Sequence, residues 1–207
     1  MGEETVFQPL SSKDRTSVIL YRTGILLSAI LLSLGAFLFI KDYAGGDWQK
    51  PASSWPGYGV TFYILSLYLA VGMSVFFIHL YVAKFRKFLK GLYYVSLVAL
   101  LIPLVIAKGD IGSVIFGTGY GPLFLLPLSG CLGFITAKEA FCFRLNEGYL
   151  LAIIMPVYIL ILSVRGISPR GAAFGLILIA GLMVLFTLRK VPMPKHYDIG
   201  DKSAYEP

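Results

Sequence analysis

Charged residues, cysteine and histidine are all scarce in this chain, and each shortage excludes a class of protein. Only 14% of the 207 residues are charged, and there are two cysteines and two histidines. Cys131 and Cys142 lie about 16 Å apart along a continuous helix, too far to bond to each other. With neither a CxxC motif nor a paired His/Cys spacing, we expect no structural zinc site.

The sequence also lacks the motifs of catalysis. Its polar segments are short, which leaves no room for a soluble catalytic domain. We find no Ser/His, paired-Asp or HExxH constellation. We therefore expect no enzyme activity, no cofactor and no bound metal ion. The basic residues are spread over several segments without a recognition module, so nucleic acid is not an expected partner.

Apolar residues, in contrast, are abundant and are arranged in long runs. Hydrophobic residues make up 57% of the chain, and the mean hydropathy is +0.78. A helix that spans a bilayer needs about 20 mostly apolar residues. Six stretches approach or exceed this length: Val18–Ile40, Tyr58–Val82, Leu92–Ala107, Pro122–Phe143, Tyr149–Val164 and Gly171–Leu188. The third and the fifth are short.

This pattern predicts an all-α, polytopic membrane bundle of six transmembrane helices. Residues 1–17 form an N-terminal segment, 18–188 the membrane domain and 189–207 a C-terminal tail. Most of the 18 lysines and arginines fall in segments on the same side as the N-terminus, and such segments are cytoplasmic in membrane proteins. We therefore expect both termini on the inner, cytoplasmic or stromal, side.

The end of the fourth stretch carries an unusual polar cluster. Its candidate functional residues are Lys138, Glu139, Cys142 and Arg144. Ionisable groups near a membrane span are costly, so they suggest function. Two alternatives stay open. Glu139 pairs with Lys84, Arg86 or another inner-side cation, or Lys138 and Glu139 relay protons or bind a polar solute. The Thr136 hydroxyl is spaced to hydrogen-bond Glu139.

Three further features have both a structural and a functional interpretation. The segment that contains Lys84, Arg86, Lys87 and Lys90 alternates with phenylalanines, which suits contacts to anionic lipid headgroups. His79 is a candidate haem or pigment ligand, or an interfacial hydrogen-bonding group. Prolines at 103, 127 and 156 predict kinked helices, of the kind found in transport sites and in ordinary membrane bundles.

The residues around the polar cluster resemble a known family. Lys138-Glu139-Ala140-Phe141-Cys142-Phe143, together with weaker matches at Asp14-Arg15 through Arg22 and at Ile78–Tyr81, is similar to the signature of uncharacterised integral membrane proteins from cyanobacteria and plastid-bearing organisms. The resemblance spans approximately residues 6–188. It implies a protein of the thylakoid or bacterial inner membrane, with Lys138, Glu139, Cys142, Arg22 and His79 as the first positions to mutate.

Three functions follow as expectations, in order of preference. The first is an accessory or assembly factor that docks on a larger membrane complex. Its expected partners are membrane lipids and that complex, and a photosynthetic complex is one candidate. The second is a small solute or ion transporter or channel that uses the Lys138–Glu139 region. The third is a haem- or pigment-binding protein, or an intramembrane enzyme.

Overall fold

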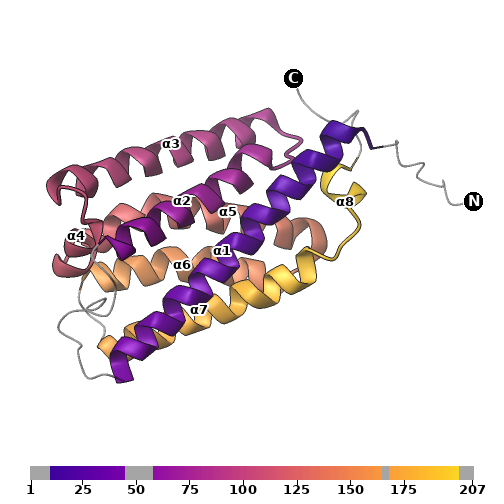
Figure 1. Cartoon of the computed structure of the whole chain (residues 1–207). Helices are drawn as coiled ribbons and strands as arrows, with labels where there is room; N and C mark the ends of the chain where they lie inside the picture. Colours follow the sequence, from indigo (N-terminus) through magenta and orange to yellow (C-terminus); the bar gives the residue numbers. More distant parts are fainter. Residues whose placement is uncertain (1–9, 45–57, 165–167, 201–207) are drawn as a thin grey trace, which may run out of the picture.

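The computed structural model describes residues 10–44, 58–164 and 168–200, and every regular element in these ranges is helical. Six helices form the bundle, and two short helices and a 3-10 turn complete it (Figure 1). The elements are α1 (Ser12–Ala44), α2 (Gly59–Phe77), α3 (Ala83–Ile106), α4 (Ile111–Gly117), η1 (Gly121–Leu125), α5 (Leu126–Phe143), α6 (Asn146–Ser163), α7 (Pro169–Lys190) and α8 (His196–Ile199).

The predicted all-α bundle of six candidate membrane spans is confirmed, because six helices are long and apolar enough to cross a bilayer. α1 packs against α2 and α7, and α5 packs against α6 and α3. The start of α1, the end of α7 and α8 lie at the same end of the bundle (Figure 1). We call this the basic end, because most of the lysines and arginines lie there. We call the other end of the bundle the opposite end.

The helix bounds differ from the apolar stretches in an instructive way. α2 ends at Phe77, and Ile78 is already extended, so the second helix is shorter than its apolar run. α3 begins at Ala83, well before Leu92, since the basic segment is itself helical and buries Leu89 on one face. The third span, which looked short in the sequence, is therefore a 24-residue helix.

The three prolines occupy two kinds of position. Pro103 lies inside α3 and Pro156 inside α6, as expected for membrane helices that tolerate proline. Pro127 instead lies in the first turn of α5, directly after η1. The expectation of a kink at Pro127 is wrong, because a proline in the first turn removes no intrahelical hydrogen bond and helps the helix to begin.

Small residues allow the helices to approach closely. A Cβ atom built on Gly24 of α1 would lie 2.4 Å from Ser74 Oγ and 2.6 Å from the carbonyl oxygen of Ala70, both in α2. At Gly148 of α6 it would lie 2.4 Å from the carbonyl oxygen of Thr136 in α5. Without a strong hydrophobic drive between helices in lipid, such backbone contacts contribute much of the association.

Gly24→Ala should therefore push α1 and α2 apart and destabilise the bundle by about 1–3 kcal/mol, the usual cost of overpacking. Gly181→Ala in α7 is the control, because its added methyl group would have no heavy atom within 4 Å. Thermal unfolding in a mild detergent should show a lower midpoint for Gly24→Ala alone. Equal midpoints would contradict the close α1–α2 contact.

Candidate functional site: a buried ionic network at the basic end

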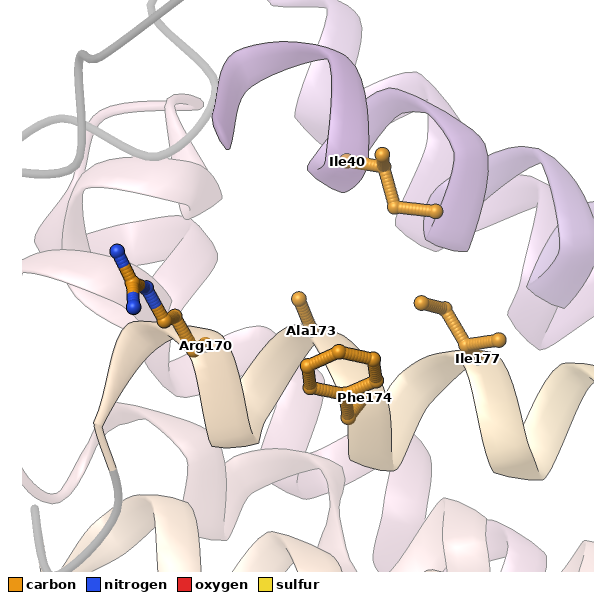
Figure 2. A pocket seen from close by; sticks show the side chains of 5 residues that line it. All are labelled: Ile40, Arg170, Ala173, Phe174 and Ile177. Atoms are coloured by element: carbon orange, nitrogen blue, oxygen red, sulfur yellow. The ribbon is translucent and has the colours of Figure 1, made fainter. Parts of the chain in front are cut away.

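The opposite end of the bundle carries a crevice between α1 and α7 (Figure 2). Its volume is about 420 Å³, and its lining residues are Ile40, Arg170, Ala173, Phe174 and Ile177. Four of these five side chains are apolar and chemically inert. Among the described residues that line the crevice, none is a nucleophile or a general acid or base.

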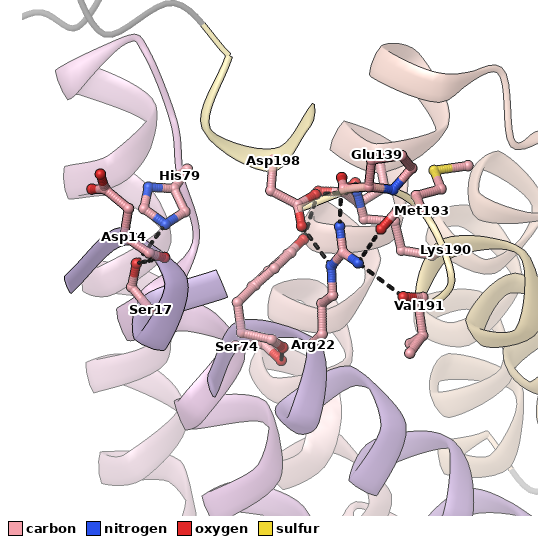
Figure 3. A network of polar contacts seen from close by, with 12 residues as sticks. Asp14, Ser17, Arg22, Ser74, His79, Glu139, Lys190, Val191, Met193 and Asp198 are labelled. Atoms are coloured by element: carbon pink, nitrogen blue, oxygen red, sulfur yellow. Dashed lines mark hydrogen bonds and ion pairs between the residues drawn. The ribbon is translucent and has the colours of Figure 1, made fainter. Parts of the chain in front are cut away.

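The basic end holds a network of ionic side chains that come from four elements (Figure 3). Glu139 in α5 is its centre and is fully buried. Its Oε1 atom accepts hydrogen bonds from the Tyr21 hydroxyl at 2.6 Å and from Lys138 Nζ at 2.7 Å. Its Oε2 atom forms an ion pair with Lys190 Nζ at 2.5 Å, without the alignment of a hydrogen bond.

Asp198 of α8 extends this network to α1. Lys190 Nζ contacts Asp198 Oδ1, and Arg22 Nε donates to Asp198 Oδ2 at 2.6 Å. The remaining nitrogens of Arg22 donate to the carbonyl oxygens of Val191, Met193 and Pro194. One guanidinium thus binds both the carboxylate and the backbone of the segment that follows α7.

Lys190 is held from a third direction by an aromatic ring. Its ammonium lies 3.7 Å from the centroid of the Phe143 ring, and its side chain is fully buried. A cation over an aromatic face is attracted by the ring quadrupole, more strongly so when it is desolvated. Lys190 therefore contacts two carboxylates and one ring, and it joins the end of α7 to α5 and α8.

Of the four residues predicted for the polar cluster, the structure brings two together. Lys138 and Glu139 belong to the ionic network, whereas Cys142 and Arg144 have exposed side chains. The expected pairing of Glu139 with a basic-end cation is found, but the cations are Lys138 and Lys190 and not Lys84 or Arg86. Thr136 donates to the carbonyl oxygen of Gly133, so the expected bond from Thr136 to Glu139 is wrong.

Sequence reasoning missed Tyr21, Lys190 and Asp198 as members of this network. Tyr21 and Lys190 lie at the ends of apolar runs, where an aromatic or basic residue is ordinary. Asp198 lies in the polar tail, with no motif around it. Arg22 did carry a signal, since it stands inside the first apolar run, where an isolated charge requires a partner.

His79 lies in the extended segment between α2 and α3 and is engaged with α1. Its Nε2 atom is 3.0 Å from Ser17 Oγ. Burial and the positive charge of Lys138 lower the pKa of His79, whereas the carboxylates of Asp198 and Asp14 oppose this shift. Axial ligation of a haem or pigment through Nε2 would require that this contact break.

The other candidate residues lie at the first turns of α3. Lys84 and Lys87 are exposed, Arg86 and Lys90 are half-buried, and Lys90 Nζ is 5.9 Å from the centroid of the Phe76 ring. Within the described residues, no group of three His, Cys, Asp or Glu side chains is arranged to hold a metal ion.

Glu139→Gln should cost about 3–5 kcal/mol of stability, since it removes the carboxylate paired with Lys138 and one of the two carboxylates paired with the buried Lys190. We expect a large fall in the thermal midpoint in detergent. Asp110→Asn is the matched control, because Asp110 is half-buried at the opposite end of the bundle. Similar thermal midpoints for the two variants would show that the network contributes little to the stability of the folded protein.

His79 predicts a dependence of stability on pH. Because its pKa is lowered in the folded state, the unfolded chain binds more protons below about pH 6.5, so stability is retained above that pH and lost as the pH falls through the folded pKa. The drop in thermal midpoint between pH 7.5 and pH 5 should be smaller in His79→Gln than in the native chain. An equal drop in both would assign the acid sensitivity to other groups.

Comparison with known proteins places this chain among integral membrane proteins. Over 208 residues it is 24% identical to a protein from Haemophilus influenzae described as an uncharacterized protein, with 100% of this chain and 99% of the relative covered. No solved structure matches the chain. Residues 73–206, which include Lys138, Glu139, Lys190 and Asp198, match the family described as uncharacterized integral membrane protein. The chain belongs to this family, DUF2301.

Proposed function

We propose that this protein is an accessory or assembly factor that docks on a larger membrane protein complex through α3 and its neighbours. The observation that carries the proposal is a set of exposed aromatic side chains along the basic-end half of α3. Phe88 is 56% exposed and Tyr94 55% exposed. Aromatic residues are enriched at the energetically important positions of protein interfaces.

These aromatic side chains are ordered by neighbouring rings. Phe85 and Phe88 pack against Phe134 of α5 at centroid distances of 6.2 and 6.0 Å, and Tyr94 packs edge-on against Phe76 of α2 at 6.2 Å. A preordered aromatic side chain loses little conformational entropy on binding. The surface therefore suits an apolar helix of a partner protein.

The charges beside the aromatic surface suggest the chemistry of that partner. Lys84 and Lys87 are exposed in the first turns of α3. They favour a partner with acidic residues at its membrane boundary, or anionic lipid headgroups around the contact.

A relative from Haemophilus influenzae favours the bacterial inner membrane over a thylakoid as the location.

A small transporter or channel is the second candidate. In its favour, a carboxylate lies between two lysines and a tyrosine hydroxyl, as in a site that exchanges protons. Against it, each charge of the network already has an internal partner, and the segment that carries Asp198 lies across the network. We rank the accessory function first for this reason.

A photoreactive phenylalanine analogue at Phe88 should crosslink to one partner protein in native membranes, because this side chain faces outward beside the basic residues. The same analogue at Phe174 of α7, which is 71% exposed, is the control and should give no discrete adduct. Mass spectrometry of the gel-shifted band identifies the partner. No adduct at Phe88, or equal adducts at both positions, would contradict the proposal, and proton flux in reconstituted vesicles would then favour the transporter.

A further inference from the structure

The ionic network carries an excess of positive charge. Arg22, Lys138 and Lys190 supply three positive charges, and Glu139 and Asp198 supply two negative charges. The adjoining pair of Arg189 and Glu147 is neutral by itself, with a nitrogen–oxygen distance of 2.7 Å. Each of the three cations is paired, but they share only two carboxylates, so the electrostatic field of the cluster favours a further anion.

The excess charge is accessible at one point. The side chain of Lys138 is 14% exposed, whereas those of Lys190 and Glu139 are fully buried. Lys138 therefore forms the rim of the network at the basic end of α5, and Arg22 and Lys190 lie beneath the segment that carries α8. A small anion that approaches this rim meets the Lys138 ammonium first.

The Asp198 carboxylate contacts both Arg22 and Lys190. It belongs to a separate segment, the one that follows α7 and contains α8. α8 has only four residues and follows a non-helical stretch after α7. Besides the burial of Ile199 and the contact between the Tyr197 and Phe143 rings, the segment makes polar contacts with α1 and with the α2–α3 connection. They are the bonds from Arg22 to Asp198 and to three carbonyl oxygens, and the bond from the Tyr81 hydroxyl to the carbonyl oxygen of Ile199 at 3.2 Å.

We propose that Arg22, Lys190 and Lys138 form a binding site for an oxyanion, and that Asp198 fills this site as an internal substitute when no ligand is bound. The ligand is a phosphate-type anion at the basic end, either a soluble phosphate or the phosphate of an anionic lipid headgroup. A guanidinium and two ammonium groups match its charge and its oxygen geometry. This inference is independent of the proposed accessory function.

The two lysines of the site keep partners when Asp198 leaves. Glu139 and the ring of Phe143 still hold Lys190, and Glu139 still holds Lys138. Departure of Asp198 raises the excess from one positive charge to two. Two of the three cations are thus already held in place for an anion, and the internal carboxylate lowers the apparent affinity for an external one.

Asp198→Asn tests this competition. Thermal unfolding of the full chain in a neutral detergent would be followed against sodium phosphate, with sodium chloride keeping the ionic strength constant. Half-saturation should need about tenfold less phosphate in Asp198→Asn than in the native chain, because the internal competitor is gone. Arg22→Gln added to Asp198→Asn should abolish the saturable response.

Glu147→Gln is the matched control. It also removes one carboxylate at the basic end, but from Arg189, whose side chain is 49% exposed. An equal gain in phosphate affinity would attribute the effect to net charge and overturn the proposal. If Asp198→Asn does not fold, Lys138→Gln in the otherwise native chain replaces it, and an unchanged phosphate response in that variant would equally overturn the proposal.

A second arm identifies the source of the phosphate group. Short-chain phosphatidylglycerol is titrated in place of inorganic phosphate, with phosphatidylcholine of the same chain length as the comparison. A response to phosphatidylglycerol alone assigns the site to an anionic lipid, and a response to inorganic phosphate assigns it to a soluble anion. No saturable response to any of the three, in either the native chain or Asp198→Asn, refutes the site.

Discussion

Two carboxylates are buried at one end of a membrane bundle, and each is stabilised by cations beside it. The ion pairs that they form join four helices, α1, α5, α7 and α8. Glu139 and Asp198 have almost no contact with solvent, and an unpaired buried carboxylate would cost several kcal/mol. Lys190 at the end of α7 contacts both of them. The last membrane helix, the fourth span and the segment after α7 are thereby tied together, and Arg22 adds α1.

This network also explains how the polar tail is fixed to an otherwise apolar molecule. The segment after α7 buries Ile199 and packs Met193 and Tyr197 against the bundle, and ionic contacts add to this packing. Arg22 binds three of its carbonyl oxygens as well as Asp198. The segment is thereby held against the basic end of the bundle.

The two ends of the bundle differ in chemistry as a result. The opposite end presents an apolar crevice between α1 and α7, whereas the basic end combines buried ion pairs with aromatic rings and exposed lysines. The proposed accessory function would use the outward surface of α3, and the proposed anion site would use the inward network. The two roles involve different residues of the same end, and neither depends on the other.

Much of the architecture follows from composition and periodicity alone. Long apolar runs with few charges leave membrane helices as the one way to satisfy every backbone hydrogen bond, so the six helical spans were predictable without the fold. The cluster of Lys138 and Glu139 was also recognisable, since ionisable residues next to a span are rare. The helical start of α3 was not recognisable from the sequence. Its basic residues suggested a polar loop, whereas one face of this segment buries Leu89.

The partners of these charges were decided only by the tertiary structure. Tyr21, Glu139, Lys190 and Asp198 are distant in the sequence, and the pairs that they form depend on which helix ends lie side by side. Helix packing sets those positions through contacts such as that of Gly24 with Ser74, which leave no local signal in the sequence. The spans and the presence of costly charges can be read from the amino-acid order, but the way those charges are neutralised depends on the fold, because only spatial proximity pairs one charge with another.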